Sequence, residues 1–221
     1  MPEPDQSKTR IPLTRARVLD AGVALADADG IAAVTMRKLG STLGVEAMAL
    51  YNHIANKDDL LDGMLDHIAD EIEFPTSEPG PNWRLHTRRR AVSAHTVLLR
   101  HPWAAAMWTA RLDLGPARMR YMDRALRSLR EAGFTGDLLD RTYHAIENHI
   151  VGHAMQALGL PLDPTDLAEL GARYLRGFPT EQYPDLAAHI RHHLDHPGGG
   201  DEFSFALDLL LDGLERLRDG R

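Results

Sequence analysis

The chain contains no cysteine among its 221 residues, which excludes disulfide bonds, thiolate metal sites and a cysteine nucleophile. It has no apolar run near the roughly 18–20 residues that a membrane-spanning helix requires. Residues 1–15 lack the apolar core of a secretory signal. We therefore expect a cytoplasmic protein with no membrane partner.

The motifs of several common enzyme classes are also missing. There is no glycine-rich phosphate loop, no G-x-S-x-G nucleophile elbow and no H-E-x-x-H zinc pair. No stretch alternates apolar and polar residues with the period of two that strands show, and no repeat of fixed length occurs. The sequence predicts an all-α protein that is not an enzyme and has no cofactor.

Positive charge is scarce as well, since 25 basic side chains face 32 acidic ones and the net charge is −7. The distribution of charge is uneven. Residues 1–57 hold seven basic and six acidic side chains, so the excess acidity lies in residues 58–221. Binding to phosphates requires local positive charge rather than a basic chain, so the amino-terminal part remains a candidate for DNA binding.

The most informative stretch is Thr35 to Lys57. Met36, Leu39 and Leu43 have the spacing of one helical face, and Gly44 follows where a residue of positive φ ends a helix. A second helix is predicted from about Glu46 to His53. Two short helices around a glycine corner are typical of a helix-turn-helix, whose second helix enters the DNA major groove. The alternative is a buried helical hairpin with no contact to DNA.

The order of residues in this stretch is T-x-R-K-L-x-x-x-L-G-V-x-x-x-x-L-Y-x-H-x-x-x-K-x-x-L-L. It resembles the DNA-binding domain of the tetracycline-repressor (TetR) family of transcription regulators. The resemblance is specific over about residues 14–72 and only architectural beyond. It implies a ligand-responsive homodimer, most often a repressor, that binds double-stranded DNA at a near-palindromic operator.

The resemblance and the outward positions of the second helix together predict the DNA contacts. Ala47, Met48 and Ala49 cannot donate a bidentate hydrogen bond, but they can pack on a thymine methyl group. Asn52 is expected to reach a base. The side chains expected at phosphates are Thr35, Arg37, Tyr51, His53 and Lys57. Two alternatives remain open, namely that Thr35 only caps its helix and that Tyr51 packs between helices.

Proline and glycine divide the chain into domains. We predict a flexible arm in residues 1–13, a DNA-binding domain in 14–74 and a helical regulatory and dimerisation domain in 83–221. Residues 75–82, with three prolines and a glycine, form the clearest break. Helices of the second domain are predicted at about 83–100, 102–110, 115–132, 137–158, 164–174, 182–194 and 201–218.

Two of these helices, 137–158 and 201–218, are apolar over more than one face and are predicted to form a dimer interface; the alternative is that both are covered within a single larger core. Gly152 leaves room for a partner helix. A small-molecule site is predicted among the flexible and aromatic side chains Trp103, Met107, Trp108, Tyr121, Met122, His149 and Met155. Each of these has an ordinary core role as its alternative.

Twelve histidines raise the question of a metal ion. His149 and His153 lie four apart on one helix, but a pair alone does not make a site and no further ligand can be located. We therefore expect no metal. The competing interpretation of the whole chain is a helical-bundle metal or small-molecule binding protein that does not bind DNA.

Overall fold

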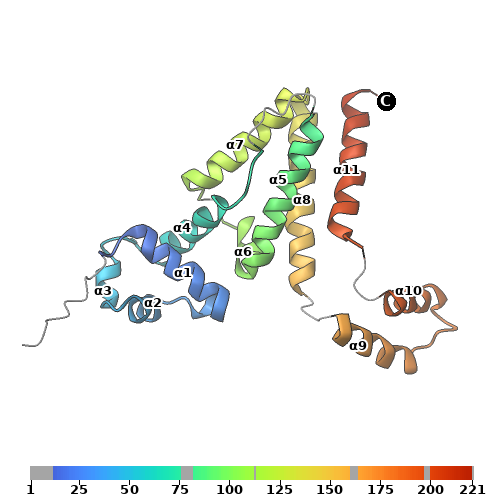
Figure 1. Cartoon of the computed structure of the whole chain (residues 1–221), viewed down its shortest axis with the longest axis horizontal. Coiled ribbons are helices and arrows are strands. Elements are labelled where there is room, and N and C mark those ends of the chain that lie inside the picture. The colour runs from blue at the N-terminus through green and yellow to red at the C-terminus, as the bar shows by residue number, and fades with distance from the viewer. Residues whose placement is uncertain (1–11, 76–81, 112, 160–163, 197–199, 221) are drawn as a thin grey trace, which may run out of the picture. The chain divides into compact units, whose positions relative to one another are not determined.

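The computed structural model of the chain describes residues 12–75, 82–111, 113–159, 164–196 and 200–220, and within these ranges it contains helices and no strand. The all-α prediction is thereby confirmed. None of the helices described is long and apolar enough to cross a membrane. The helices are α1 (Arg15–Asp29), α2 (Met36–Leu43), α3 (Ala47–Leu50), α4 (Lys57–Ala69), α5 (Trp83–Arg100), α6 (Pro102–Trp108), α7 (Pro116–Glu131), α8 (Gly136–Gly159), α9 (Pro164–Arg176), α10 (Pro184–Asp195) and α11 (Glu202–Arg218), with a 3₁₀ turn at Ile31–Ala33 (Figure 1).

The chain forms two compact units that are not continuous in sequence. The first contains Met1–Ile72 and Arg100–Asp123, and the second contains Glu73–Leu99 and Arg124–Arg221. Helices α1 to α4 and α6 therefore belong to the first unit, and α7 is divided between the two. The predicted arm and the predicted break lie largely outside the described residues, since 1–11 and 76–81 are not among them.

Side-chain caps set the starts of three helices in the first unit. The hydroxyl of Thr14 accepts a hydrogen bond from the Arg17 amide, and that of Thr35 accepts one from the Lys38 amide at 3.2 Å. The Asn56 side chain accepts from the Asp59 amide at 2.9 Å. In each case a side-chain oxygen satisfies an amide that the first turn of the helix leaves unpaired.

Glycines let the helices of the first unit approach closely. A Cβ atom on Gly22 of α1 would lie 2.9 Å from the Met64 sulfur, and one on Gly63 of α4 would lie 2.8 Å from Leu19. Around them a core of fully buried side chains joins α1, α2, the end of α3 and α4. Its members include Val18, Leu39, Leu50, Ile54, Leu60, Met64, Leu65 and Ile68.

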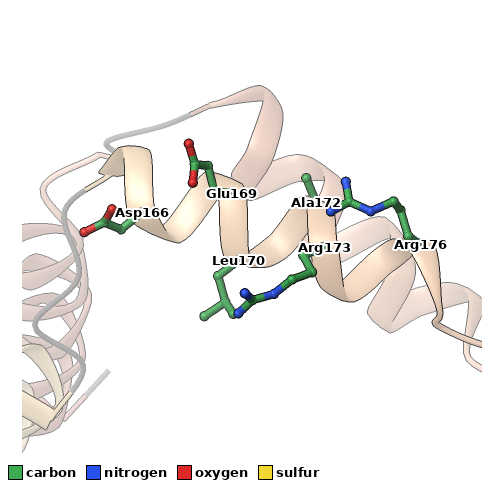
Figure 2. A pocket seen from close by; sticks show the side chains of 6 residues that line it. All are labelled: Asp166, Glu169, Leu170, Ala172, Arg173 and Arg176. Carbon is green, nitrogen blue, oxygen red and sulfur yellow. The ribbon is translucent and has the colours of Figure 1, made fainter.

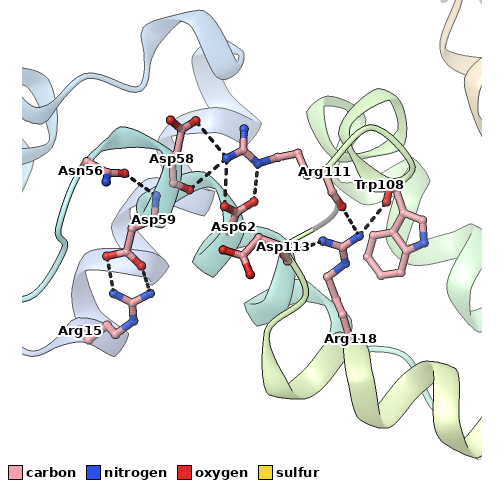
Figure 3. Close-up of polar contacts among 9 residues, drawn as sticks. All are labelled: Arg15, Asn56, Asp58, Asp59, Asp62, Trp108, Arg111, Asp113 and Arg118. Carbon is pink, nitrogen blue, oxygen red and sulfur yellow. Dashed lines mark hydrogen bonds and ion pairs between the residues drawn. The ribbon is translucent and has the colours of Figure 1, made fainter.

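Helix α4 and its C-cap carry an acidic stripe, which we define as Asp58, Asp62, Asp66 and Asp70, at intervals of four residues. Arg111 pairs with Asp58 at 3.0 Å and also with Asp62 (Figure 3). The backbone amide of Arg118 donates to Asp66 at 2.8 Å, and Arg120 pairs with Asp70 at 2.8 Å. The segment that follows α6 is thus tied to α4 along the length of the helix.

In the second unit, α5, α8 and α11 lie side by side (Figure 1). The buried guanidinium of Arg90 on α5 donates to Glu147 on α8 at 2.6 Å, so this charge is paired within the core. Arg84 and Arg88 of α5 pair with Asp208 of α11. Trp83 packs edge-on against Phe134 at 5.0 Å between ring centroids.

Three histidines from two helices gather around Phe203 of α11. The His95 ring stacks on Phe203 at 3.9 Å, and its Nε2 lies 2.9 Å from Nδ1 of His153. His149 stacks on the same phenyl ring at 4.7 Å and hydrogen-bonds the Phe203 carbonyl through Nε2. Burial, reinforced by the neighbouring His153 and His149, lowers the pKa of His95 to about 4. In the described part of the chain no group of three or more histidine or acidic side chains is arranged to hold a metal ion.

This cluster predicts acid sensitivity of the second unit. The folded pKa of His95 lies below the value of about 6.5 expected in the unfolded chain, so the unfolded chain binds more protons between pH 6.5 and about 4. Stability should therefore fall as the pH is lowered through that window, with a slope from this group of at most about 1.4 kcal/mol per pH unit. Denaturant unfolding at a series of pH values should show a shallower slope for His95→Gln than for the native chain. An unchanged slope would remove His95 as the cause.

Candidate nucleic-acid interface

The corner between α2 and α3 depends on the absence of a side chain at Gly40. A Cβ atom there would lie 2.8 Å from the Val45 carbonyl oxygen and 3.2 Å from the Ala47 amide nitrogen. Gly44 ends α2 in the left-handed region, at a φ of 67°, as its position in the sequence predicts. The Val45 amide then donates back to the Gly40 carbonyl at 2.9 Å. Backbone thus packs directly on backbone at this corner.

The second helix is shorter than the sequence analysis predicts. Regular α-helix extends over Ala47–Leu50 rather than from Glu46 to His53. The amides of Tyr51, Asn52 and His53 instead donate to carbonyls three residues earlier. Such bonds tighten the last turn of a helix, and the chain must reverse at once to bury Ile54 and begin α4. We refer to residues 47–53 as the recognition segment.

One face of the recognition segment is open to solvent. Met48 is 74% exposed and Tyr51 46% exposed, and Asn52 is exposed as well. Ala47 and Ala49 are half-buried beside them, whereas Leu50 is fully buried and holds the segment on the core. The exposed face therefore combines a flexible apolar side chain with an amide and a phenol, which can contact thymine methyl groups, base edges and phosphates.

The other predicted contact residues lie on the helices that precede and follow the recognition segment, or at their starts. Arg37 near the start of α2 and Lys57 at the start of α4 are exposed, and neither side chain forms an ion pair with any residue described. Thr35 is exposed and caps α2, so the capping role is confirmed while a contact to phosphate remains a prediction. Lys38, in contrast, is paired with Asp29 at 2.6 Å.

Two residues near the carboxyl-terminal end of the recognition segment are not predicted from the sequence, namely Arg15 and Asp59. Arg15, at the start of α1, forms a two-pronged ion pair with Asp59 of α4, with N–O distances of 2.6 and 3.0 Å (Figure 3). It also donates to the carbonyl oxygen of His53 at 3.0 Å. The pair raises the pKa of Arg15 and lowers that of Asp59. They are 44 residues apart, and no local pattern links them.

The residues predicted to bind a small molecule are divided between the two units. Trp103, Met107, Trp108, Tyr121 and Met122 are in the first unit, and His149 and Met155 are in the second. Trp108 and Tyr121 meet edge-to-face at 5.8 Å. Trp103 is buried, and its indole nitrogen donates to Asp27 at 2.7 Å, which gives it a structural role.

A pocket of about 430 Å³ lies elsewhere, along α9 (Figure 2). Its lining consists of Asp166, Glu169, Leu170, Ala172, Arg173 and Arg176. Acidic side chains lie toward the amino-terminal end of the helix and arginines toward the carboxyl-terminal end. All six residues come from one helix, and none belongs to the set predicted for a ligand. We therefore do not assign it as a ligand site.

Comparison with known proteins gives consistent matches over both units. A family model described as "Bacterial regulatory proteins, tetR family" matches residues 18–64, and one described as "Tetracyclin repressor-like, C-terminal domain" matches residues 74–218. An HTH-type transcriptional regulator of Saccharopolyspora erythraea is 33% identical over 186 residues, which are 84% of this chain and 78% of the relative. The HTH-type transcriptional repressor DrrR1 of Streptomyces coeruleorubidus is 31% identical, over 93% of this chain and 78% of the relative.

A solved structure matches the chain over nearly its whole length. The Streptomyces coelicolor TetR family protein ActR, in complex with actinorhodin, superposes with a TM-score of 0.77 at 26% identity. The superposition covers 94% of this chain and 99% of ActR.

The close contact at Gly40 yields a stability prediction. Alanine normally favours a helix over glycine by up to about 1 kcal/mol. Gly40→Ala should instead lower the free energy of unfolding by about 1–3 kcal/mol, because backbone atoms of the corner must move to admit the methyl group. Chemical denaturation measures the change, and Ser41→Ala at the next, exposed position of α2 is the control and should not destabilise. A Gly40→Ala chain as stable as the native one would contradict the close approach.

Proposed function

The chain belongs to the TetR family of transcription regulators, and we propose that it represses its target by binding a near-palindromic operator as a homodimer and releases it when a small molecule binds. It is a regulator rather than an enzyme. The observation that carries the proposal is the exposed face of the recognition segment around Met48, together with Arg37 and Lys57 on the helices before and after it, which are exposed and unpaired among the residues described. Acting on operator DNA, the protein works in the cytoplasm.

We infer that this face enters the major groove. Ala47, Met48 and Ala49 then contact thymine methyl groups, and Asn52 contacts a base edge. The side chains that bind phosphates are Thr35, Arg37, Tyr51, His53 and Lys57. With so few donors aimed at base edges, part of the sequence preference must come from apolar contacts and from the shape of the DNA.

Dimerisation is inferred from the exposed side of α11. Phe205, Leu209 and Leu217 are 65%, 56% and 63% exposed, and they recur along one helix. Monomeric proteins rarely leave such a row of large apolar side chains uncovered. On α8, a Cβ atom at Gly152 would meet nothing within 4 Å, so a partner helix has room to approach. A two-fold dimer would present two recognition segments to half-sites about 34–36 Å apart.

The domain division of the proposal follows the sequence, with DNA reading in 14–74 and regulation in 83–221. The two family models support it, since one ends at residue 64 and the other begins at residue 74. A small-molecule effector is supported by the ActR complex with actinorhodin. Among the predicted ligand residues we favour Met107, Trp108, Tyr121 and Met122, since Trp103 is already engaged with Asp27.

The acidic stripe of α4 supplies a route for regulation within the first unit. Arg111 holds Asp58 and Asp62 next to Lys57, and it follows directly on the helix that carries Met107 and Trp108. A ligand that displaces this segment would therefore move the start of α4 and the phosphate contacts there. Coupling between two sites of this kind is typically about 1–3 kcal/mol.

DNA binding can be tested by gel shift with the DNA upstream of the protein's own gene. Arg37→Ala and Lys57→Ala should each weaken binding to operator and unrelated DNA alike, and each should reduce the slope of log K against log salt by about 1. Arg191→Ala, which removes an exposed positive charge from α10, is the control and should leave both unchanged. If Arg37→Ala and Lys57→Ala both bind DNA like the native chain, the proposed DNA-binding surface is wrong.

The dimer interface can be tested with a charge on α11. Leu209→Glu should shift the protein to monomers, because the carboxylate would have to be buried against the partner. Leu85→Glu places the same charge at an exposed leucine of α5 and should leave the assembly unchanged. Light scattering distinguishes the two forms, and a Leu209→Glu chain that remains a stable dimer would remove this face of α11 from the interface.

A further inference from the structure

We propose that Arg15 and Asp59 position the recognition segment for sequence-specific DNA binding, although neither contacts DNA. The proposal rests on the function proposed above and names two positioning residues for it. The recognition segment contains a single short stretch of α-helix, and a helix of that length is not stable by itself. Its geometry must be imposed by neighbouring parts of the fold.

Arg15 holds the carboxyl-terminal end of the segment. One guanidinium nitrogen, Nη1, donates both to Oδ2 of Asp59 and to the carbonyl oxygen of His53, each at 3.0 Å, while Nη2 donates to Oδ1 of Asp59 at 2.6 Å. A carbonyl at the end of a helix has no partner in the helix itself, so a side chain that binds it fixes where the segment ends. The planar fork also sets the direction from which Arg15 approaches.

Asp59 holds the turn that follows. Its Oδ2 accepts a hydrogen bond from the Ala55 amide at 2.7 Å, and its own amide is capped by Asn56 (Figure 3). The reciprocal arrangement of side chain and amide resembles a capping box at the start of α4. One carboxylate therefore links the turn after the recognition segment, the start of α4 and the start of α1.

The space for this arrangement is built into α4. A Cβ atom at Gly63 would lie 3.0 Å from Nη2 of Arg15, so the missing side chain leaves room for the guanidinium. An exposed ion pair usually adds little to global stability. The effect of this one is therefore expected in DNA recognition, where a misplaced segment loses its contacts to bases.

Charge alone predicts the opposite result for one substitution, which makes the proposal testable. Asp59→Asn removes a negative charge near the DNA, and electrostatics by itself would raise the affinity for phosphates. If Asp59 positions the segment, the same substitution should lower operator affinity, because asparagine cannot retain the charged fork with Arg15. The sign of the change separates the two explanations.

The experiment measures the Kd of the full chain for the upstream operator and for unrelated DNA at one salt concentration. Asp59→Asn should weaken operator binding about tenfold, which is the size expected for the loss of a charged hydrogen bond, and should leave unrelated DNA bound equally or more tightly. Asp20→Asn is the matched control, because it removes the same charge from another exposed carboxylate of the first unit, one that lies 3.0 Å from His67 of α4. It should not weaken operator binding.

A second variant keeps the charge and covers the case in which Asp59→Asn does not fold. Arg15→Lys should weaken operator binding several-fold at unchanged affinity for unrelated DNA, since an ammonium group cannot make the fork and reach the His53 carbonyl together. Circular dichroism establishes that each variant is folded.

Operator affinity equal to or above the native value in a folded Asp59→Asn, or in Arg15→Lys, would overturn the positioning role. A native chain that does not distinguish the operator from unrelated DNA would instead overturn the proposed function, which is a separate result.

Discussion

The proposed DNA-binding surface depends on how the neighbouring helices hold a recognition segment that has little stability of its own. Its amino-terminal end rests on α2 through the backbone contact at Gly40, and its carboxyl-terminal end is bound by Arg15. Between the two, Leu50 is fully buried in the core of the first unit. An isolated helix of a few residues is far below the roughly 12–15 residues that are marginally stable in water. The surrounding helices therefore supply the conformation that the recognition segment needs.

Helix α4 connects the proposed DNA-binding and effector-binding parts of the first unit. Asp59 faces α1 and the recognition segment, whereas the acidic stripe is tied to Arg111, Arg118 and Arg120. The carboxylates of this region therefore bind Arg15 of α1 and, separately, the arginines of the segment after α6. The Arg15 pair and the bonds to the acidic stripe involve the same helix, so the proposed coupling between ligand and DNA would act through α4.

Local structure was largely predictable from the sequence, because it depends on neighbouring residues. The bounds of α5 match the prediction, and the caps at Thr14, Thr35 and Asn56 are where hydroxyl and amide side chains precede apolar stripes. The second helix of the helix-turn-helix is shorter than predicted. Its apolar spacing continues past Leu50, whereas the chain turns there to bury Ile54. The pairs Arg15–Asp59 and Trp103–Asp27 were missed, because periodicity carries no information about contacts 44 and 76 residues apart.

The chemistry of the proposed DNA contacts explains why such anchoring matters here. A bidentate hydrogen bond to a base can guide a side chain into place through its own directionality. The recognition segment instead begins with alanine, methionine and alanine, which can contact a thymine methyl group only through dispersion and apolar burial. A gap of about 0.5–1 Å already forfeits a quarter to a half of a dispersion contact. Apolar contacts do not correct the position of the helix that carries them. A recognition segment of this composition must therefore be placed accurately by the rest of the fold. Gly40, Arg15 and Asp59 are the residues that place it.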